Sequence, residues 1–486
     1  MPKLFTSHSE ETYEDVERRA LGVAAELRRR GLVTGDRVTF KAANSAGYVT
    51  VLLALMHAGA SIVLLDHQQQ ESVSRRIAAQ SRSRLEITDA ETAGSATPEL
   101  GSVTVEELTA AAGPLTTTEP AGLSFTAWRA LPDALITWSS GSTGEPKGIA
   151  KSGEAMLRNL DRSIERMGHR PEDVLLPLLP FSHQYGLSMV LTAWLARASL
   201  LVAPYWRLDH AVRMAGSFGA TVVDATPAVH LSILNLVERR PEMVSDLRKV
   251  RMYCTGGAPL DQSAGRRFTQ VLGLPLLDGY GSTELGNVAF ATPGNPVGCG
   301  PVLPGLDVEF TIDEEVEAGE GGGAPDSGIG EVTVRTPDLF SGYLADDGTV
   351  VPVTDEWYRT GDLGRLDAHG NLFVLGRKLA VHRMGYTLYP EVIERTAGAC
   401  GAPVKIVPLP DDRLGSRLVF VVADPELRSP LFWRERICAE LSPFEYPNRV
   451  LVRAHFPLNR NGKPDARELK RLALSSNEAL EDRSSL

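Results

Sequence analysis

The sequence is poor in the residues that build disulfide frameworks and zinc sites. Its four cysteines, Cys254, Cys299, Cys400 and Cys438, stand far apart among 486 residues, and no C-x-x-C pair occurs. The ten histidines are scattered as well. This spacing is unlike that of a disulfide-stapled or zinc-binding chain. We therefore expect a protein of the reducing cytoplasm.

Long apolar runs and an excess of positive charge are also missing. The most apolar stretches, 51–65 and 187–202, are interrupted by His57 and Arg197, which favours buried elements over membrane spans. The first residues lack the apolar core of a signal peptide. A formal net charge of -11 argues against nucleic acid or an anionic membrane as a partner.

The hydrophobic pattern alternates between helices and strands. Residues 10–30 and 44–59 have helical periodicity, whereas 37–41 and 60–65 have the pattern of strands. The same alternation continues after residue 154, which predicts a layered α/β domain with mostly parallel sheets and a ligand edge at the carboxyl ends of the strands. From Lys378 onward, short strands and helices predict a small α+β domain. The glycine-rich stretch 319–330 separates two alternating strands and reads as a hairpin or linker loop.

A polar, glycine-rich segment at 137–148, T-W-S-S-G-S-T-G-E-P-K-G, follows an apolar run. Glycines let backbone N–H groups converge on one anion, and the hydroxyls and the lysine add donors and positive charge. It is not a Walker A loop, because Gly148 and not Ser or Thr follows the lysine. A surface loop is the alternative for any Ser/Gly run, but this order favours triphosphate binding. The candidate residues are Ser139, Ser140, Gly141, Ser142, Thr143, Gly144 and Lys147.

This segment resembles the phosphate loop of the adenylate-forming (ANL) superfamily, which includes acyl-CoA synthetases, adenylation domains of peptide synthetases and luciferases. Five further segments follow in the superfamily's order, and the resemblance covers residues 10 to 472. One of them, D-G-Y-G-S-T-E at 278–284, follows an apolar strand. The resemblance implies Tyr280 on adenine, Thr283 near the α-phosphate and Glu284 on Mg²⁺, a cation that prefers oxygen ligands.

Two further segments concern the ribose and the catalytic lysine. Asp362 in Y-R-T-G-D-L offers a carboxylate for both ribose hydroxyls, although an aspartate after glycine also caps turns. The resemblance implies that Arg377 contacts ribose or phosphate. It also implies that Lys463, in P-L-N-R-N-G-K, is the catalytic lysine, whose ammonium suits charge developing on the α-phosphate and the substrate carboxylate.

The hinge segment departs from the superfamily's pattern. Where many relatives have G-R-x-D-D-x-I-K, this chain has G-R-K-L-A-V-H-R from 376, one residue shorter. Alignment backward from Gly385 places Lys378 at the hinge and His382 where lysine is usual. We therefore expect two domains, 1–377 and 378–486.

Three segments concern the acid. The resemblance implies that His183, in F-S-H-Q-Y-G, lines the acyl pocket, and that Gly256 and Gly257 form its wall. Ser182 stands where domains that activate α-amino acids carry aspartate, which disfavours an ordinary α-amino acid. Asp224 interrupts an apolar strand, and a buried carboxylate needs a partner. That partner is either nearby backbone N–H groups or a substrate ammonium; the second alternative resembles stand-alone enzymes that load β-amino acids onto carrier proteins for macrolactam polyketides.

Together these segments imply an ATP- and Mg²⁺-dependent ligase. Its fold would be a large α/β domain with a β-barrel-like subdomain and a small mobile α+β domain. It would form an acyl-adenylate and transfer the acyl group to an external phosphopantetheine thiol, on a carrier protein or CoA. A fatty- or aryl-acid CoA ligase is an alternative within this class. Rivals of other classes are an ATP-hydrolysing or phosphotransfer enzyme and a nucleotide-binding protein without ligase activity.

Overall fold

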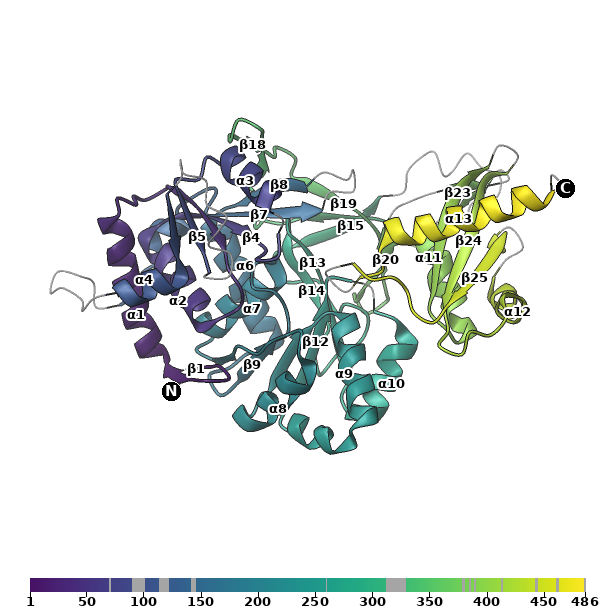
Figure 1. Cartoon of the computed structure of the whole chain (residues 1–486), viewed down its shortest axis with the longest axis horizontal. Helices are drawn as coiled ribbons and strands as arrows, with labels where there is room; N and C mark the ends of the chain where they lie inside the picture. The colour runs from purple at the N-terminus through teal and green to yellow at the C-terminus, as the bar shows by residue number, and fades with distance from the viewer. Residues whose placement is uncertain are drawn as a thin grey trace.

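A computed structural model describes most of the chain, in a large N-terminal part and a smaller C-terminal part (Figure 1). The described residues are 1–69, 71–89, 101–112, 122–140, 146–258, 260–311, 329–377, 381–383, 386–388, 390–411, 414–441, 445–459 and 463–484.

The first sheet has eight strands, and its half nearest the N-terminus is parallel. Strands β7 (Leu135–Ser140) and β8 (Pro146–Lys151), which flank the phosphate loop, are antiparallel, and β8 pairs with the later strand β17 (Gly342–Leu344). In spatial order the strands are β18 (Val350–Pro352), β17 (Gly342–Leu344), β8 (Pro146–Lys151), β7 (Leu135–Ser140), β4 (Ser61–Leu65), β3 (Arg37–Lys41), β5 (Leu85–Thr88) and β6 (Ser102–Thr104). The helices of this half are α1 (Tyr13–Arg29), α2 (Ala46–Ala58), α3 (Glu71–Gln80), α4 (Val105–Ala111) and α5 (Thr126–Arg129).

The second sheet also has eight strands and is parallel from β13 to β1. In spatial order they are β14 (Gly286–Phe290), β13 (Leu276–Ser282), β12 (Met252–Gly256), β11 (Val222–Ala225), β9 (Val174–Pro177), β10 (Ser199–Leu201), β1 (Lys3–Phe5) and β2 (Glu10–Thr12). The helices connecting them are α7 (Gln184–Leu195), α8 (Leu208–Phe218), α9 (Pro227–Arg239) and α10 (Gln262–Leu272), with a 3₁₀ turn η1 (Pro241–Leu247). This parallel order brings the carboxyl ends of β9, β11, β12 and β13 to one edge.

Helix α6 (Gly153–Met167) follows β8 and packs against β14. Its start is fixed by Ser152, whose side chain accepts a hydrogen bond from the Ala155 N–H, as an N-cap serine does. It ends at Gly168, whose positive φ of 62° suits a glycine C-cap.

The third sheet is antiparallel, in the order β15 (Asp307–Thr311), β16 (Gly330–Arg335), β19 (Trp357–Leu366) and β20 (Leu372–Arg377). The small C-terminal part follows it. Its elements are a hairpin of β21 (Val381–Arg383) and β22 (Tyr386–Leu388), a sheet of β23 (Val404–Asp411), β24 (Gly415–Ala423) and β25 (Arg449–Arg453), a 3₁₀ turn η3 (Gly398–Cys400), and helices α11 (Pro390–Ala397), α12 (Pro430–Glu440) and α13 (Ala466–Ser484).

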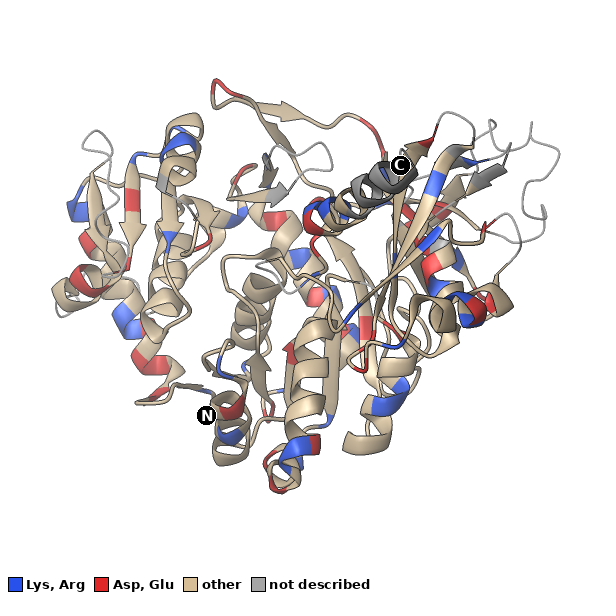
Figure 2. Cartoon of the chain, turned by 45° about the vertical axis from the view of Figure 1, so that its right-hand side comes forward, with Lys and Arg blue, Asp and Glu red and all other residues tan. Residues whose placement is uncertain are grey.

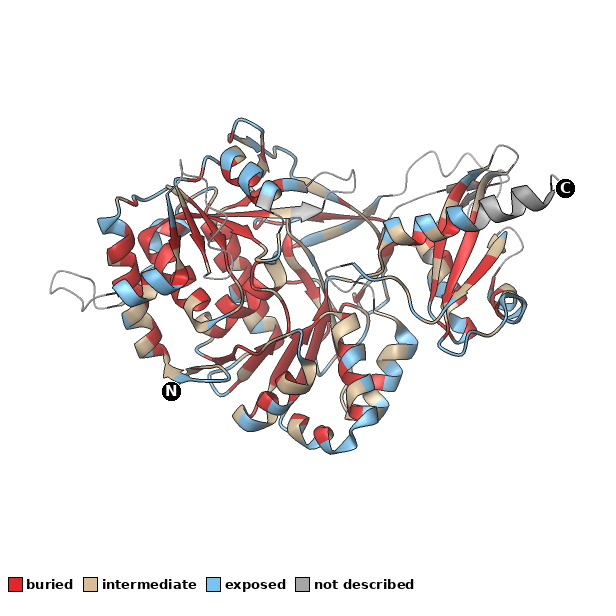
Figure 3. Ribbon diagram, viewed as in Figure 1, coloured by how far each residue is buried: buried red, intermediate tan, exposed pale blue. Residues whose placement is uncertain are grey.

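Figure 3 shows the strands of the large part buried and the outward faces of its helices exposed. The two faces of the second sheet belong to different cores. Val222 and Met252 pack in the core shared with α1, α2 and α7, whereas Val223 and Tyr253 pack in a separate core with α8, α9 and α10. Because side chains alternate along a strand, Asp224 lies on the same face as Val222.

These elements confirm the predicted fold class, a large part with mostly parallel sheets and a small α+β part. The segment between β4 and β7 contains α3, β5, β6, α4 and α5. The glycine-rich stretch 319–330 falls mostly outside the described residues. In the described part of the chain, none of the helices has both the length and the apolar character needed to cross a bilayer. Figure 2 shows acidic and basic residues interspersed over both parts.

Candidate functional site

The phosphate loop connects two antiparallel strands. Ser139 and Ser140 end β7, and Lys147 stands directly opposite Ser139 on β8. Residues 141–145, with Gly141, Ser142, Thr143 and Gly144, lie outside the described residues, and of Ser139 and Ser140 only the backbone is described. The hairpin therefore holds the two ends of the segment side by side.

Two tyrosines link Lys147 to Glu284. The Lys147 ammonium lies 5.6 Å from the centre of the Tyr343 ring, and the hydroxyl oxygens of Tyr343 and Tyr358 are 3.4 Å apart. Burial, then the Glu284 carboxylate, raise the pKa of Tyr358 above its usual value. The structure thus gathers the phosphate-loop lysine and the expected metal ligand in one region. Sequence reasoning assigned no role to either tyrosine.

The expected adenine and ribose residues are in direct contact. The Tyr280 hydroxyl donates a hydrogen bond of 2.6 Å to Oδ2 of Asp362. The Asp362 N–H is fixed by the hydroxyl oxygen of Thr360 at 3.0 Å, and Asp362 pairs with Arg377 across β19 and β20. The side chain of Arg377 is not described. Tyr280 and Asp362, far apart in sequence, therefore come together as one nucleoside site would require.

Thr283 and Glu284 stand in the turn between β13 and β14. The carbonyl oxygen of Glu284 accepts hydrogen bonds from the Phe340 N–H at 2.8 Å and from the Lys151 ammonium at 3.3 Å. Burial lowers the pKa of Lys151 to about 8, against the opposing effect of the Asp338 and Glu284 carboxylates.

The described residues hold no cluster of three side chains that would bind a metal ion alone. One carboxylate in a turn fits Mg²⁺, because this ion takes most of its ligands from phosphates and water in nucleotide sites.

Asp224 is buried at the carboxyl end of β11, with 3% of its surface exposed. Its Oδ1 accepts a hydrogen bond of 3.1 Å from the hydroxyl of Tyr185 on α7. Its Oδ2 is buried, and among the described residues no donor reaches it. Burial raises the pKa of Asp224 to about 7, although the Tyr185 hydrogen bond opposes this. Tyr185 lies within the F-S-H-Q-Y-G segment, but the sequence does not reveal that it contacts Asp224.

His183 is the N-cap residue of α7 and contacts an acidic residue that sequence reasoning missed. Its Nε2 lies 3.4 Å from Oδ2 of Asp66, which follows β4. The Ser182 hydroxyl donates to the same oxygen at 3.3 Å. Burial opposes ionisation of Asp66, but the hydrogen bonds from His183 and from the Gln68 N–H lower its pKa to about 2. Asp66 is therefore an anion, and its carboxylate orients the imidazole of His183.

The glycine-rich segment after β12 lies next to Tyr185. A Cβ on Gly256 would meet the Gly279 carbonyl oxygen at 3.2 Å and the Tyr185 ring at 3.5 Å. Gly257 has a φ of +75°, which favours glycine. A side chain at Gly256 would therefore change the space beside Tyr185, whereas a Cβ on Gly257 would meet no other atom within 4 Å.

Lys463 lies in the small part. Its N–H donates to the Asn459 side chain at 3.0 Å, and its carbonyl accepts from the Asn459 N–H at 2.7 Å. These bonds hold Asn459 and Lys463 together shortly before α13, whose first turn is at the end of the helix nearer the large part (Figure 1). The expected hinge, Lys378, lies outside the described residues.

The profile of the AMP-binding enzyme family matches residues 2–344. The chain belongs to this family and is an AMP-forming ligase that adenylates an acid. This sets aside the phosphotransfer and silent-binding rivals.

Two curated relatives match almost the whole chain. A fatty acid–acyl-carrier-protein ligase, ScoC, of Streptomyces coeruleorubidus is 28% identical over 94% of this chain and 91% of its own length. A 4-chlorobenzoate–CoA ligase of Arthrobacter sp. is 29% identical over 94% of this chain and 89% of its own length. Among solved structures, ATP-bound MatB from Rhodopseudomonas palustris shares the fold, with a TM-score of 0.84 at 24% identity over 97% of this chain and 95% of that protein.

Proposed function

We propose that this ligase activates a β-amino acid as its adenylate and passes the acyl group to the phosphopantetheine thiol of an external carrier protein. The evidence for an amino acid as the substrate is the buried Oδ2 of Asp224, which has no hydrogen-bond donor among the described residues. A substrate ammonium would supply that donor.

The surroundings of Asp224 support a binding role over a purely structural one. An unpaired buried carboxylate costs several kcal/mol or is held by protonation, and here burial raises the pKa of Asp224 to about 7. Tyr185 satisfies one oxygen and orients the group, leaving the other for a ligand. Gly256 ends the neighbouring strand β12 and has no side chain to crowd the Tyr185 ring, which a Cβ would approach to 3.5 Å. An ammonium bound there would restore the charged form.

For the nucleotide, we assign the roles that the gathered residues suit. The phosphate loop, with Ser139, Ser140 and Lys147, holds the triphosphate. Tyr280 stacks on adenine, Asp362 accepts the ribose hydroxyls, and Arg377 assists. Thr283 contacts the α-phosphate and Glu284 holds Mg²⁺, which neutralises charge on the leaving pyrophosphate when bound.

The reaction has two steps. The substrate carboxylate attacks the α-phosphorus of ATP, a phosphorus–oxygen bond forms, and pyrophosphate leaves. Lys463 stabilises the charge that develops on the α-phosphate and the carboxylate. The thiol sulfur, having lost its proton, then attacks the acyl carbon, and AMP leaves. His183 and the wall formed by Gly256 and Gly257 position the acyl group throughout.

We assign domains 1–377 and 378–486, with rotation about Lys378 serving the two steps in turn. The small part has its own buried core, including Phe420, Trp433 and Ile437, which suits movement as a unit. A carrier protein as acceptor is supported by ScoC, whose name specifies an acyl carrier protein. A fatty- or aryl-acid CoA ligase is the second candidate, favoured by the chlorobenzoate–CoA ligase relative.

The decisive experiment is ATP–pyrophosphate exchange with fatty, aryl, α-amino and β-amino acids. We expect exchange with a β-amino acid and its loss in Asp224→Asn. Thr255→Val is the matched control: it removes a buried hydroxyl on the neighbouring strand, on the opposite face from Asp224. Exchange only with fatty or aryl acids would refute the amine site and establish the second candidate. Adding carrier protein or CoA to the preformed adenylate then identifies the acceptor.

A further inference from the structure

The backbone of the Glu284 turn is held from two elements that are remote in sequence. The carbonyl oxygen of Glu284 accepts the Phe340 N–H and the Lys151 ammonium. Two donors on one carbonyl fix its direction. Because the Glu284 side chain leaves from the same residue, they also fix where its carboxylate can reach.

Lys151 is unusual in being a lysine with only 2% of its surface exposed. Lysine is almost never fully buried unless it is paired. Lys151 ends β8, the strand on which Lys147 stands four residues earlier. Its ammonium lies within the influence of two carboxylates, Asp338 and Glu284, so a buried cation here has electrostatic support. Burying an ammonium costs desolvation free energy, which a hydrocarbon side chain of the same size would avoid. This indicates that the ammonium itself has a role.

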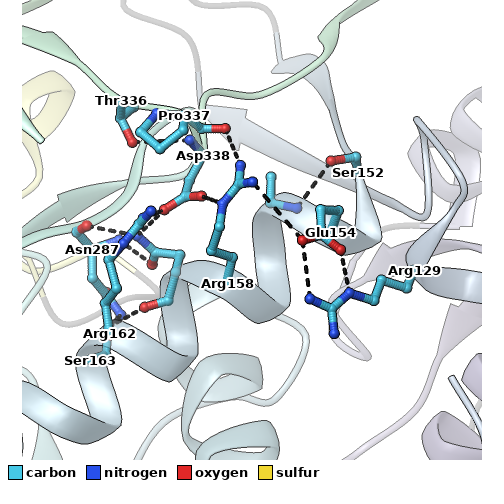
Figure 4. A network of polar contacts seen from close by, with 12 residues as sticks. Arg129, Ser152, Glu154, Arg158, Arg162, Ser163, Asn287, Thr336, Pro337 and Asp338 are labelled. Atoms are coloured by element: carbon cyan, nitrogen blue, oxygen red, sulfur yellow. Dashed lines mark hydrogen bonds and ion pairs between the residues drawn. The ribbon is translucent and has the colours of Figure 1, made fainter. Parts of the chain in front are cut away.

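The surroundings of Lys151 are rigid. Asp338, with 0% of its surface exposed, accepts a hydrogen bond of 2.7 Å from Arg158 Nε and forms an ion pair with Arg162. Both arginines are on α6. Figure 4 shows these two arginines reaching Asp338 from one helix, while Glu154 joins Arg158 to Arg129. The segment that contains Asp338 also supplies Phe340. The first donor to Glu284 is therefore anchored through α6.

The same helix holds the other side of the turn. The side chain of Asn159 exchanges two 2.9 Å hydrogen bonds with the backbone of Asn287 on β14, accepting from its N–H and donating to its carbonyl. The Asn287 side chain donates to the Ser163 hydroxyl at 2.9 Å. At Gly286, a Cβ would lie 2.7 Å from Oδ1 of Asn159. Both flanks of the turn are thus fixed. Lys151 is the side-chain donor to the Glu284 carbonyl, whereas the Tyr358 hydroxyl hydrogen-bonds to the Glu284 carboxylate.

We propose that Lys151 is a positioning residue for metal–nucleotide binding, in which its ammonium holds the Glu284 carbonyl and so aims the Glu284 carboxylate and the Thr283 hydroxyl. This inference rests on the proposed role of Glu284 as a ligand of the nucleotide's Mg²⁺. It concerns the nucleotide and not the acid, and is therefore independent of the substrate class.

Lys151→Met tests it, because methionine keeps much of the length and removes the donor. The readout is pyrophosphate exchange as a function of free Mg²⁺ and of ATP, together with calorimetric binding of ATP at several Mg²⁺ concentrations. Groups that orient metal ligands typically change metal affinity 10- to 100-fold. We expect a rise of about tenfold in the Mg²⁺ concentration for half-maximal activity and in the KM for ATP, with the KM for the acid unchanged.

Lys405→Met is the matched control, because Lys405 forms its ion pair with Glu394 in the small part; its Mg²⁺ dependence should equal that of the wild type. Lys151→Leu, which also removes the donor from this buried position, gives the same readout if the methionine variant is insoluble. An unchanged Mg²⁺ dependence in the folded Lys151 variant, or an equal loss in every kinetic parameter, would overturn the inference. Glu284→Gln distinguishes failure of the positioning role of Lys151 from failure of the metal role of Glu284. If Glu284→Gln alters the Mg²⁺ dependence and Lys151→Met does not, only the positioning role fails. If Glu284→Gln also leaves it unaltered, the metal role of Glu284 fails, and the inference with it.

Discussion

Replacing Asp224 by asparagine should lower activity and raise stability at the same time. Asparagine has nearly the same shape but no charge and no titration. In the wild type, Asp224 is buried, accepts one hydrogen bond from Tyr185 and has a pKa raised from 3.8 to about 7. That difference corresponds to roughly 4 kcal/mol by which burial disfavours the charged carboxylate.

The sign of the pH dependence follows from proton binding. Between pH 3.8 and about 7 the folded protein holds the Asp224 proton while the unfolded chain loses it. The free energy of unfolding therefore falls as the pH rises through this window. Asp224→Asn removes this loss, so the variant should be more stable than the wild type at pH 8, with the difference disappearing toward pH 4.

The effect on activity has the opposite sign. Without the carboxylate, the bound substrate ammonium would be buried without a counter-charge, which costs about 2–5 kcal/mol. At 1.36 kcal/mol per tenfold, kcat/KM for the amino acid should fall by at least about 30-fold. The assays are pyrophosphate exchange and thermal unfolding, each run from pH 5 to pH 8 on the wild type, Asp224→Asn and Thr255→Val. An unchanged kcat/KM in Asp224→Asn, or a variant less stable than the wild type at pH 8, would refute the reasoning.

Three further predictions concern neighbouring groups. Tyr185→Phe removes the hydrogen bond that lowers the pKa of Asp224. Because the substrate amine needs the ionised carboxylate, the pH at which kcat/KM rises should increase by about one unit. An unshifted pH profile would contradict this. Asp66→Asn removes the anion beside His183, so the KM for the acid should rise several-fold while the KM for ATP stays constant; a change in the ATP value alone would count against it. Lys463→Ala should abolish adenylation in the exchange assay yet leave transfer from a supplied acyl-adenylate to thiol intact, and equal loss of both steps would exclude the assigned role.

The strands and the nucleotide segments could be predicted from the sequence because their signals are local. The apolar runs that form β4 and β11 are visible within a few residues, and so is the D-G-Y-G-S-T-E turn that carries Tyr280 and Glu284. The family resemblance then ordered these segments. The match to the AMP-binding family confirms the family resemblance, whereas the roles of the individual site residues stay predictions.

The partners of the site residues could not be predicted, because each contact joins elements distant in the chain. Asp66 meets His183 only because β4 of the first sheet and α7 of the second half pack together. Lys151 meets Glu284 across 133 residues. No periodicity in either segment specifies the other. Similarly, the hydroxyl of Tyr185 reaches Asp224 only because the fold places β11 beside α7.

Strand β8 has a consequence for recombining this ligase with its relatives. Lys147 and Lys151 stand four residues apart on one face of it, a spacing of about 13 Å at 3.3 Å per residue. One lysine lies near the phosphate loop and the other holds the Glu284 turn. Deleting or inserting one residue between them would turn the second lysine to the opposite face. Chimeras should therefore exchange β8 whole, with crossover points placed outside Pro146–Lys151.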